Sequence, residues 1–259
     1  MIKLSEVTYT STELLATVAA SVLEDGKTVL VGTGLPMIAA MLAQRTRTPN
    51  ILMFFEAGGV GPQMPVLPIS VGDSRTFYKA IAASSMHDTM SLMQAGYIDY
   101  GFLGAAQIDR YGNINTTVIG EWNNPKARLP GSGGANDVAS LCNRTIIILR
   151  QDKMKFVNKV DFITSPGFLT GPGAREAAGL PADNGPFRVI TQFGVYCFNP
   201  HTKRMKLFSI HPGVTKQQII ENSCFEIEIP DSVPLSPTPT EHDKKVLHEI
   251  DPLGMVLGK

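Results

Sequence analysis

The chain has 259 residues, of which 43% are hydrophobic and 18% are charged, a composition typical of a globular protein. Its 23 basic and 23 acidic residues cancel, and no polybasic run is present, which argues against nucleic acid or an anionic membrane surface as a partner. No apolar run approaches about 18 residues, so neither a signal peptide nor a membrane span is predicted. The three cysteines are widely spaced and form no CxxC pair, so we expect a reducing, cytoplasmic location.

The N-terminal part predicts a helix followed by a strand–helix–strand unit. Thr10 and Glu13 have the spacing of a capping box, and the apolar residues after them share one helical face. Lys27-Thr-Val-Leu-Val31 predicts a buried strand, Pro36 suits the first turn of a helix, and Ile51–Phe55 predicts the next strand. Two strands connected in this way are expected to be parallel, with a right-handed crossover.

The middle of the chain predicts further elements separated by two long loops. Residues 57–72 are rich in Gly and Pro, and residues 120–134 are polar and contain several glycines. Long loops in compact domains are often functional. Further helices are expected at 87–95 and 135–141, and strands at 98–103, 114–119 and 145–149.

Beyond residue 150 the pattern becomes richer in strands, expected at 188–191, 195–198 and 205–210, and Thr215 begins a second capping box. Residues 229–241 are rich in Pro, Ser and Thr and are expected to be extended. We therefore predict a single α/β domain over residues 1–228, followed by a Pro-rich extended segment and C-terminal tail over 229–259. The fold class is α/β, with an open, mostly parallel sheet flanked by helices and a β-richer C-terminal part.

Gly32-Thr-Gly34 follows a predicted strand and precedes a predicted helix, which is the setting of a dinucleotide-binding turn. Glu56 follows at the distance along the chain where an acidic residue would contact a ribose. The third glycine position is occupied by Met37, which would crowd the helix against the strand. Nucleotide binding and an ordinary tight turn are both open interpretations of this segment.

Glu56 stands where the apolar strand Ile51–Phe55 gives way to Ala57-Gly58-Gly59. Functional groups of open α/β sheets gather beyond the carboxyl ends of the strands. A carboxylate in that place can act as a general base, a metal ligand or a nucleophile. The competing interpretation is a structural glutamate that is solvated or bonded to backbone N–H groups. The neighbouring glycines favour a functional role, because they let a bulky substrate approach the carboxylate.

Gly131-Ser-Gly-Gly-Ala-Asn136 precedes a predicted helix, so its backbone N–H groups can form a nest for an anion or an oxyanion. The structural alternative is that Asn136 or Asp137 caps that helix. The histidines are scattered without the spacing of metal ligands, so no metal site is predicted. The chain has neither a GxSxG elbow nor a P-loop lysine, which argues against a serine hydrolase or a Walker-type NTPase.

Three segments together resemble one known family. They are Phe55-Glu56-Ala57-Gly58, Gly104-Ala-Ala-Gln-Ile-Asp-Arg-Tyr-Gly-Asn113 and Gly131-Ser-Gly-Gly-Ala-Asn-Asp137. Their order and spacing resemble the β-type subunit of the family I coenzyme A transferases, and the resemblance extends over nearly the whole chain. It implies the open α/β fold of that family.

The resemblance also implies a reaction. In this family a glutamate of the β-type chain is the nucleophile, and by position it falls on Glu56. The implied activity is ping-pong transfer of coenzyme A between an acyl-CoA and a small carboxylic or dicarboxylic acid, through a glutamyl-CoA thioester. Residues expected to contact the acyl group, the CoA or an oxyanion are Gln107, Gly133, Gly134, Ala135 and Asn136. The residues expected to form a supporting loop are Ala57, Gly58 and Gly59.

Family members of this type work with a homologous α-type subunit, so the resemblance implies an α2β2 or larger assembly and an inactive chain on its own. No permanently bound cofactor is expected, since the coenzyme A thioester is a substrate. The alternative is the same fold acting as an acyl-CoA hydrolase, a ring-cleaving hydrolase or a decarboxylase. Some relatives with those activities replace the glutamate, so the presence of Glu56 favours transfer. The sequence does not identify the acid.

Overall fold

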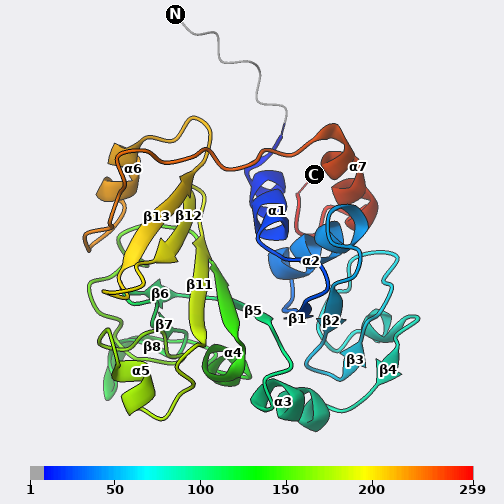
Figure 1. The fold of residues 1–259 in the computed structure, drawn as a ribbon, viewed down its shortest axis with the longest axis horizontal. Helices are drawn as coiled ribbons and strands as arrows, with labels where there is room; N and C mark the ends of the chain where they lie inside the picture. Colours follow the sequence, from blue (N-terminus) through cyan, green and yellow to red (C-terminus); the bar gives the residue numbers. More distant parts are fainter. Residues whose placement is uncertain (1–8, 259) are drawn as a thin grey trace, which may run out of the picture.

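The structure is a computed structural model that describes residues 9–258 (Figure 1). Its centre is a nine-stranded sheet, whose strands are β1 (Thr28–Leu30), β2 (Leu52–Phe54), β3 (Gly59–Val60), β4 (Ala82–Ala83), β5 (Tyr100–Gly104), β10 (Arg144–Ile148), β11 (Gly185–Ile190), β12 (Gly194–Phe198) and β13 (Met205–Ile210). They lie in the order β13-β12-β11-β10-β5-β1-β2-β3-β4. The β1–α2–β2 unit expected from the sequence is present.

The five central strands, from β11 to β2, run parallel, and the strands outside them pair in the antiparallel sense. In the centre, Val29 of β1 lies opposite Met53 of β2 on one side and Tyr100 of β5 on the other. Parallel strands bring their carboxyl ends to the same edge of the sheet. The predicted class, α/β with a mostly parallel sheet flanked by helices, is confirmed.

Two hydrophobic clusters cover the two faces of the sheet, because successive side chains of a strand point in opposite directions. One face is covered by α1 (Ser11–Ser21), α2 (Leu35–Thr46) and α7 (Glu241–Ile250), and the other by α3 (Met86–Gln94), α4 (Ala135–Leu141) and α6 (Lys216–Glu221). The capping boxes predicted at Thr10 and Thr215 are both present. No helix within residues 9–258 is both long and apolar enough to cross a membrane.

The C-terminal segment returns to the N-terminal helices. Residues 229–240 run along β13, where Leu235 bridges Ile210, and then reach α7, which packs on α2 (Figure 1). Leu247 and Ile250 of α7 are fully buried in the same cluster as α1 and α2. The end of the chain therefore contributes to the core of the α/β domain.

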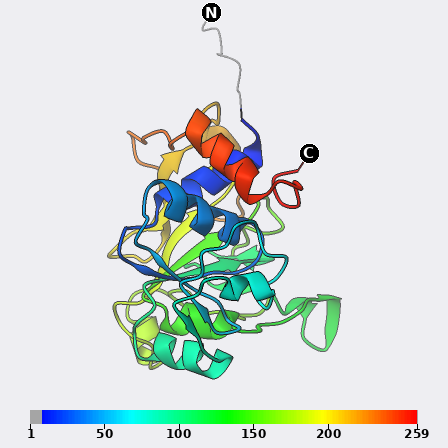
Figure 2. The same cartoon turned by 90° about the vertical axis from the view of Figure 1, so that its right-hand side faces the viewer.

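The prediction of one strand over residues 114–119 was wrong, because the chain turns in its middle. β7 (Ile114–Asn115) pairs with β6 (Gln107–Ile108), whereas β8 (Val118–Glu121) pairs with β9 (Asn124–Arg128). The Asn115 side-chain oxygen accepts hydrogen bonds from the N–H groups of Thr117 and Val118, a local bond that competes with strand continuation. The polar loop predicted over 120–134 is therefore largely the β8–β9 hairpin, which projects from the body of the molecule (Figure 2).

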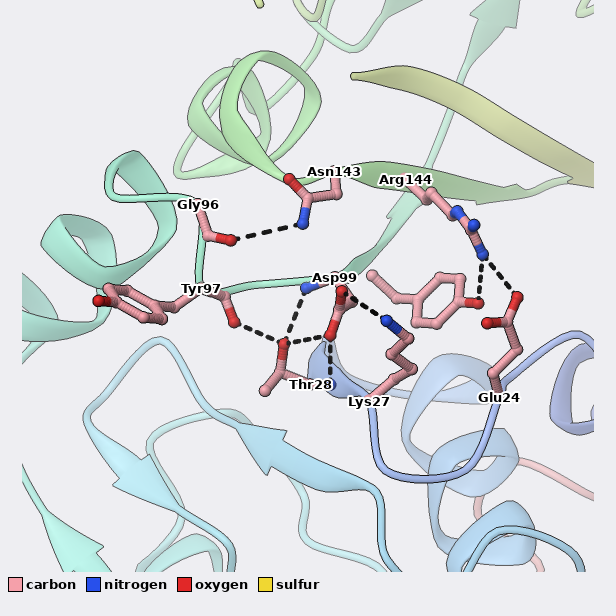
Figure 3. A network of polar contacts seen from close by, with 9 residues as sticks. Glu24, Lys27, Thr28, Gly96, Tyr97, Asp99, Asn143 and Arg144 are labelled. Carbon is pink, nitrogen blue, oxygen red and sulfur yellow. Dashed lines mark hydrogen bonds and ion pairs between the residues drawn. The ribbon is translucent and has the colours of Figure 1, made fainter. Parts of the chain in front are cut away.

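A polar network joins the amino ends of the parallel strands (Figure 3). Asp99, just before β5, accepts hydrogen bonds from the N–H and hydroxyl groups of Thr28 on β1, at 3.0 and 3.1 Å. The Thr28 hydroxyl also donates to the Tyr97 carbonyl, and the Lys27 ammonium lies 3.4 Å from Asp99. Burial alone would raise the pKa of Asp99, but these donors outweigh burial and hold the pKa below its usual value. The network thus fixes the register of β1 against β5.

Replacing Asp99 by Asn tests this network. A carboxyl group whose pKa is lowered by folding stabilises the native state above its unfolded pKa of about 3.9, and this contribution disappears as pH falls through the folded pKa. Asp99→Asn should therefore lower the free energy of unfolding by about 1 kcal/mol at pH 7, and the loss should shrink as the pH falls below about 4. Urea unfolding of both proteins between neutral and acidic pH measures it. A deficit that does not change with pH would contradict the role assigned to Asp99.

Candidate active site

Glu56 lies in a tight turn at the carboxyl end of β2. The turn is closed by two backbone hydrogen bonds of 2.9 Å, from the Phe55 N–H to the Gly59 carbonyl and from the Gly58 N–H to the Phe55 carbonyl. Phe55 is fully buried in the core, whereas Glu56 is half-buried. An anchored aromatic residue on one side and a closed turn on the other hold the Glu56 backbone in place, so the carboxylate starts from a rigid support.

Gly58 and Gly59 are required by packing of the turn against its neighbours. A Cβ atom at Gly58 would lie 2.1 Å from the Ser84 carbonyl oxygen, and one at Gly59 would lie 2.2 Å from the Thr76 carbonyl oxygen. Gly58 also has a φ of +106°, which side chains rarely adopt. Neither these two glycines nor Ala57 lines the pocket beside Glu56. The space that we expected the glycines to leave for a substrate is filled by protein backbone, so they support the turn.

The loop 131–134 faces Glu56 from the amino end of α4. A Cβ atom added at Gly134 would lie 3.1 Å from the Glu56 Oε1 atom and 3.2 Å from the Met90 methyl group. Real Cβ atoms are rarely found so close to other heavy atoms. The carboxylate therefore approaches the loop backbone at a distance that only glycine accommodates without movement.

Hydrogen bonds at both ends hold this loop in place. The Gly131 N–H donates to the Thr116 carbonyl, and the Thr116 hydroxyl donates back to the Gly131 carbonyl, at 2.9 and 2.8 Å. The N–H groups of Ala135 and Asn136 donate to the carbonyl and the hydroxyl of Ser132. Within residues 9–258, the intervening N–H groups of Gly133 and Gly134 have no protein acceptor. These two amides are thus free to donate to a bound molecule.

Glu56 and the loop border a pocket of about 260 Å³ at the carboxyl ends of β1 and β5. Its lining residues are Leu30, Val31, Gly32, Glu56, Val71, Met90, Phe102, Leu103, Ser132, Gly133, Gly134, Ala135 and Val138. Among these lining residues Glu56 has the only ionisable side chain, and most of the others are apolar. A single carboxylate in apolar surroundings, opposite free amides, is suited to act on an electrophilic carbonyl group.

The structure brings together Glu56, Gly133, Gly134 and Ala135 of the predicted site residues. Gln107 and Asn136 do not line the pocket. Gln107 is 5% exposed, and its amide group donates to Asp161 and accepts from Asn115. The Asn136 side chain donates to the Thr164 carbonyl at 3.0 Å and does not cap α4, which begins after Gly134 without a side-chain cap.

Both Gln107 and Asn136 belong to a scaffold behind the loop. The Thr164 hydroxyl accepts a hydrogen bond from the Thr116 N–H, and the Thr164 carbonyl accepts one from the Asn136 side chain. Both ends of the 131–136 loop are therefore held to Thr164, one through Thr116 and the other through Asn136. Asn113 accepts the Gly167 N–H at 2.9 Å and donates to Asp109, whose pKa is raised by burial. The segments 104–113 and 164–167 therefore position the site loop from behind.

Most of the apolar lining residues were not anticipated from the sequence, and Val71, Met90 and Phe102 are examples. Val71 comes from the long 57–72 loop, and the length of that loop was the only signal for it. Met90 lies on α3 and Phe102 on β5, where apolar residues are expected for packing alone. Gly32 also lines the pocket, while Met37 is fully buried where a dinucleotide-binding turn would have its third glycine. Within the part of the chain that the structure describes, no cluster of three or more potential metal ligands is present.

Alanine substitutions at Gly131 and Gly58 can distinguish the free-energy cost of backbone strain from that of a steric clash, because the two glycines have similar φ angles but different surroundings. Gly131 has a φ of +95° and open space around its Cβ position, whereas Gly58 has a φ of +106° and a blocked position. Gly131→Ala should lower the free energy of unfolding by about 1–3 kcal/mol. Gly58→Ala should lower it by about 1–3 kcal/mol more, because overpacking adds to the strain. Urea unfolding measures both, and equal losses would refute the packing role of Gly58.

Comparison with known proteins places the chain in a family. A model of the coenzyme A transferase family matches residues 12–222. The chain is 40% identical over 247 residues to the B subunit of 3-oxoadipate CoA-transferase from Pseudomonas knackmussii, covering 94% of each chain. It is 38% identical over 250 residues to the B subunit of glutaconate CoA-transferase from Acidaminococcus fermentans, covering 94% of this chain and 93% of the relative.

The structure of this chain is also similar to that of a solved relative. The crystal structure of glutaconate coenzyme A-transferase from A. fermentans has a TM-score of 0.92 to this chain at 35% identity, covering 98% of this chain and 100% of that one. The order and spacing of the segments around Glu56, Gln107 and Gly134 had predicted this relationship, and the comparisons confirm it. The protein belongs to the coenzyme A transferase family.

Proposed function

We propose that this chain is the B-type subunit of an enzyme that transfers coenzyme A between an acyl-CoA and a small carboxylic or dicarboxylic acid. Glu56 is the proposed nucleophile. The observation that carries the proposal is its position, since it is the only ionisable side chain lining an apolar pocket and lies against the backbone of Gly134. The names of the two B-subunit relatives above support transfer as the reaction.

The proposed reaction is a sequence of exchanges at three carbonyl carbons: those of the donor acyl group, of Glu56 and of the acceptor acid. The Glu56 carboxylate attacks the thioester carbonyl, and the intermediate collapses to a mixed anhydride as the coenzyme A thiolate leaves. The thiolate then attacks the glutamyl carbonyl, which releases the first acid as a carboxylate and leaves a glutamyl-CoA thioester. The acceptor carboxylate attacks this thioester, and the same steps run in reverse. Every bond formed is matched by one broken, so no oxidant, reductant or bound cofactor is needed.

A carboxylate is a weak nucleophile in water, and the pocket can compensate for this by orienting Glu56 and by providing hydrogen-bond donors. A rigid turn holds Glu56, and orientation of this kind lowers barriers by about 7–11 kcal/mol in favourable cases. Each attack develops negative charge on a carbonyl oxygen, and the free N–H groups of Gly133 and Gly134 are the proposed donors. Loss of one such donor typically costs about 3–4 kcal/mol. Where a bound substrate and the apolar walls exclude water, these hydrogen bonds become stronger.

We also propose that the active enzyme contains a homologous α-type subunit, in an α2β2 or larger assembly. Both relatives named above are B subunits, and the chain spans 94% and 93% of their lengths, so it corresponds to one subunit of such an enzyme. On this proposal the chain alone is inactive, and the partner completes the site. The three free cysteines suit action in the reducing cytoplasm.

Trapping the covalent intermediate tests the mechanism. The chain reconstituted with its α-type partner is incubated with an acyl-CoA and reduced with borohydride, which converts a glutamyl thioester to an alcohol. Peptide mass spectrometry should locate the alcohol at Glu56. Glu56→Ala should abolish both labelling and transfer, while Glu221→Ala, at an exposed glutamate on α6, should change neither. Undiminished transfer by Glu56→Ala would exclude the mechanism, and hydrolysis without transfer would favour the hydrolase alternative.

Gly134→Ala tests the close approach of the loop to the carboxylate. The added methyl group would lie 3.1 Å from the Glu56 Oε1 atom, so the carboxylate or the loop must shift. The required shift is a few tenths of an ångström. Because a misplacement near 1 Å costs about 100-fold in rate, kcat should fall by about 3–10-fold, with little change in the melting temperature. Gly72→Ala is the matched control, since Gly72 does not line the pocket, its Cβ position is open and its φ is also not positive. Equal rates for the two variants would show that the approach is not needed.

A further inference from the structure

A second pocket lies on the opposite flank of the sheet, beside α1. It has a volume of about 280 Å³ and shares no lining residue with the pocket at Glu56. Its lining residues are Val18, Ser21, Val22, Leu23, Glu24, Phe187, Arg188, Val195, Phe208, Ser209 and Pro237. The walls are thus mainly apolar, and they carry one arginine and one glutamate. Small-molecule sites are commonly apolar hollows with a few polar groups.

Arg188 differs from the other cations nearby in having no acidic partner. Arg144 pairs with Glu24 at 2.6 Å (Figure 3), Arg204 with Glu226 at 3.3 Å, and Lys206 with Glu228 at 2.9 Å. Within residues 9–258, Arg188 forms no ion pair. The carboxylate of Glu24, the acid that lines this pocket, is already bonded to Arg144. The pocket therefore has an uncompensated positive charge.

The Arg188 guanidinium is held in place but incompletely hydrogen-bonded. It stacks between the rings of Phe187 and Phe208, at 3.9 and 4.3 Å from their centroids. One Nη1 bond goes to the Phe187 carbonyl, while the buried Nε atom has no acceptor in the described chain. Burial lowers the pKa of Arg188, which reflects the cost of removing this cation from water.

Arg175 shows how the same protein satisfies a buried arginine that has a structural role. Arg175 is 1% exposed, and within residues 9–258 it also has no acidic partner and no acceptor for its Nε atom, but its two terminal nitrogens donate to four backbone carbonyls. Two of these carbonyls, from Ala139 and Ser140, belong to the last turn of α4, where a cation is favoured by the helix dipole. Arg188 lines the pocket without an equivalent set of acceptors, since within residues 9–258 its terminal nitrogens make one hydrogen bond, from Nη1 to the Phe187 carbonyl.

We propose that the pocket beside α1 binds a small carboxylate on an apolar body, whose charge pairs with Arg188. The planar guanidinium matches a carboxylate in geometry, and stacking by Phe187 and Phe208 orients it in advance. The side chains of Val22 and Val195 are then the contacts for the apolar body. A phosphate group fits less well, because one guanidinium and apolar walls do not compensate a doubly charged anion. The proposal does not depend on the chemistry at Glu56.

Fluorine NMR titration of the full chain in its native assembly tests the proposal. The probe is 4-fluorobenzoate, and its neutral match is 4-fluorobenzamide. The wild-type protein and Glu56→Ala should bind the carboxylate equally, and the amide should bind at least about tenfold more weakly. Arg188→Gln should weaken carboxylate binding by about 10–100-fold, as expected for loss of a charge-assisted hydrogen bond. Arg150→Gln removes the same charge from an exposed arginine after β10 and should bind as the wild type does.

A second variant keeps the test decisive if Arg188→Gln is poorly folded. Val22→Phe leaves Arg188 in place and fills the apolar end of the pocket, so it should also weaken binding of the carboxylate. Melting temperatures establish that each variant is folded. Three results would overturn the proposal: no binding by the wild type, equal binding by the carboxylate and the amide, or unchanged binding in both pocket variants.

Discussion

The close approach of the Glu56 carboxylate to the backbone of Gly134 is the constraint on which the candidate site depends. It joins the carboxyl end of β2 to the amino end of α4, two elements far apart in the chain, at a separation where an added methyl group would make a neighbour shift. Three segments around the site hold the carboxylate and the Gly134 loop close together. The closed turn after Phe55 presents the carboxylate, Thr116 holds one end of the opposite loop, and Thr164 holds the other through Asn136.

Rigidity has a chemical consequence here. A carboxylate attacks a thioester slowly in water, so an enzyme that uses one gains most from fixing its position and from donors aimed at the developing oxyanion. The polar residues around the site have a supporting role. The side-chain amides of Gln107, Asn113 and Asn115 form hydrogen bonds to other protein groups, and none of these residues lines the pocket. The polar residues that make the sequence recognisable are therefore largely those that hold the loop, whereas apolar residues form most of the pocket wall.

Local patterns were sufficient for the regular elements. Capping boxes located the starts of α1 and α6, the apolar run before Glu56 predicted β2, and the range predicted for α4 agrees with the structure. They failed at residues 114–119, where an apolar and β-branched run is divided by the Asn115 side chain. They also assigned the glycines after Glu56 to substrate access, since a sequence does not show that Ser84 and Thr76 occupy the adjacent space.

The sequence by itself determined the α/β class and the family, because these depend on periodicity and on short motifs in a fixed order, and it singled out Glu56 as the candidate carboxylate. Only the tertiary structure decided which motif residues reach the pocket. It placed Gly133 and Gly134 beside Glu56 and kept Gln107 and Asn136 out of the pocket. Among the described residues it also left Arg188 without an acidic partner. The physical reason is that hydrogen-bond partners and free space are set by contacts between distant segments, and a side chain's type does not reveal whether its donors are already used.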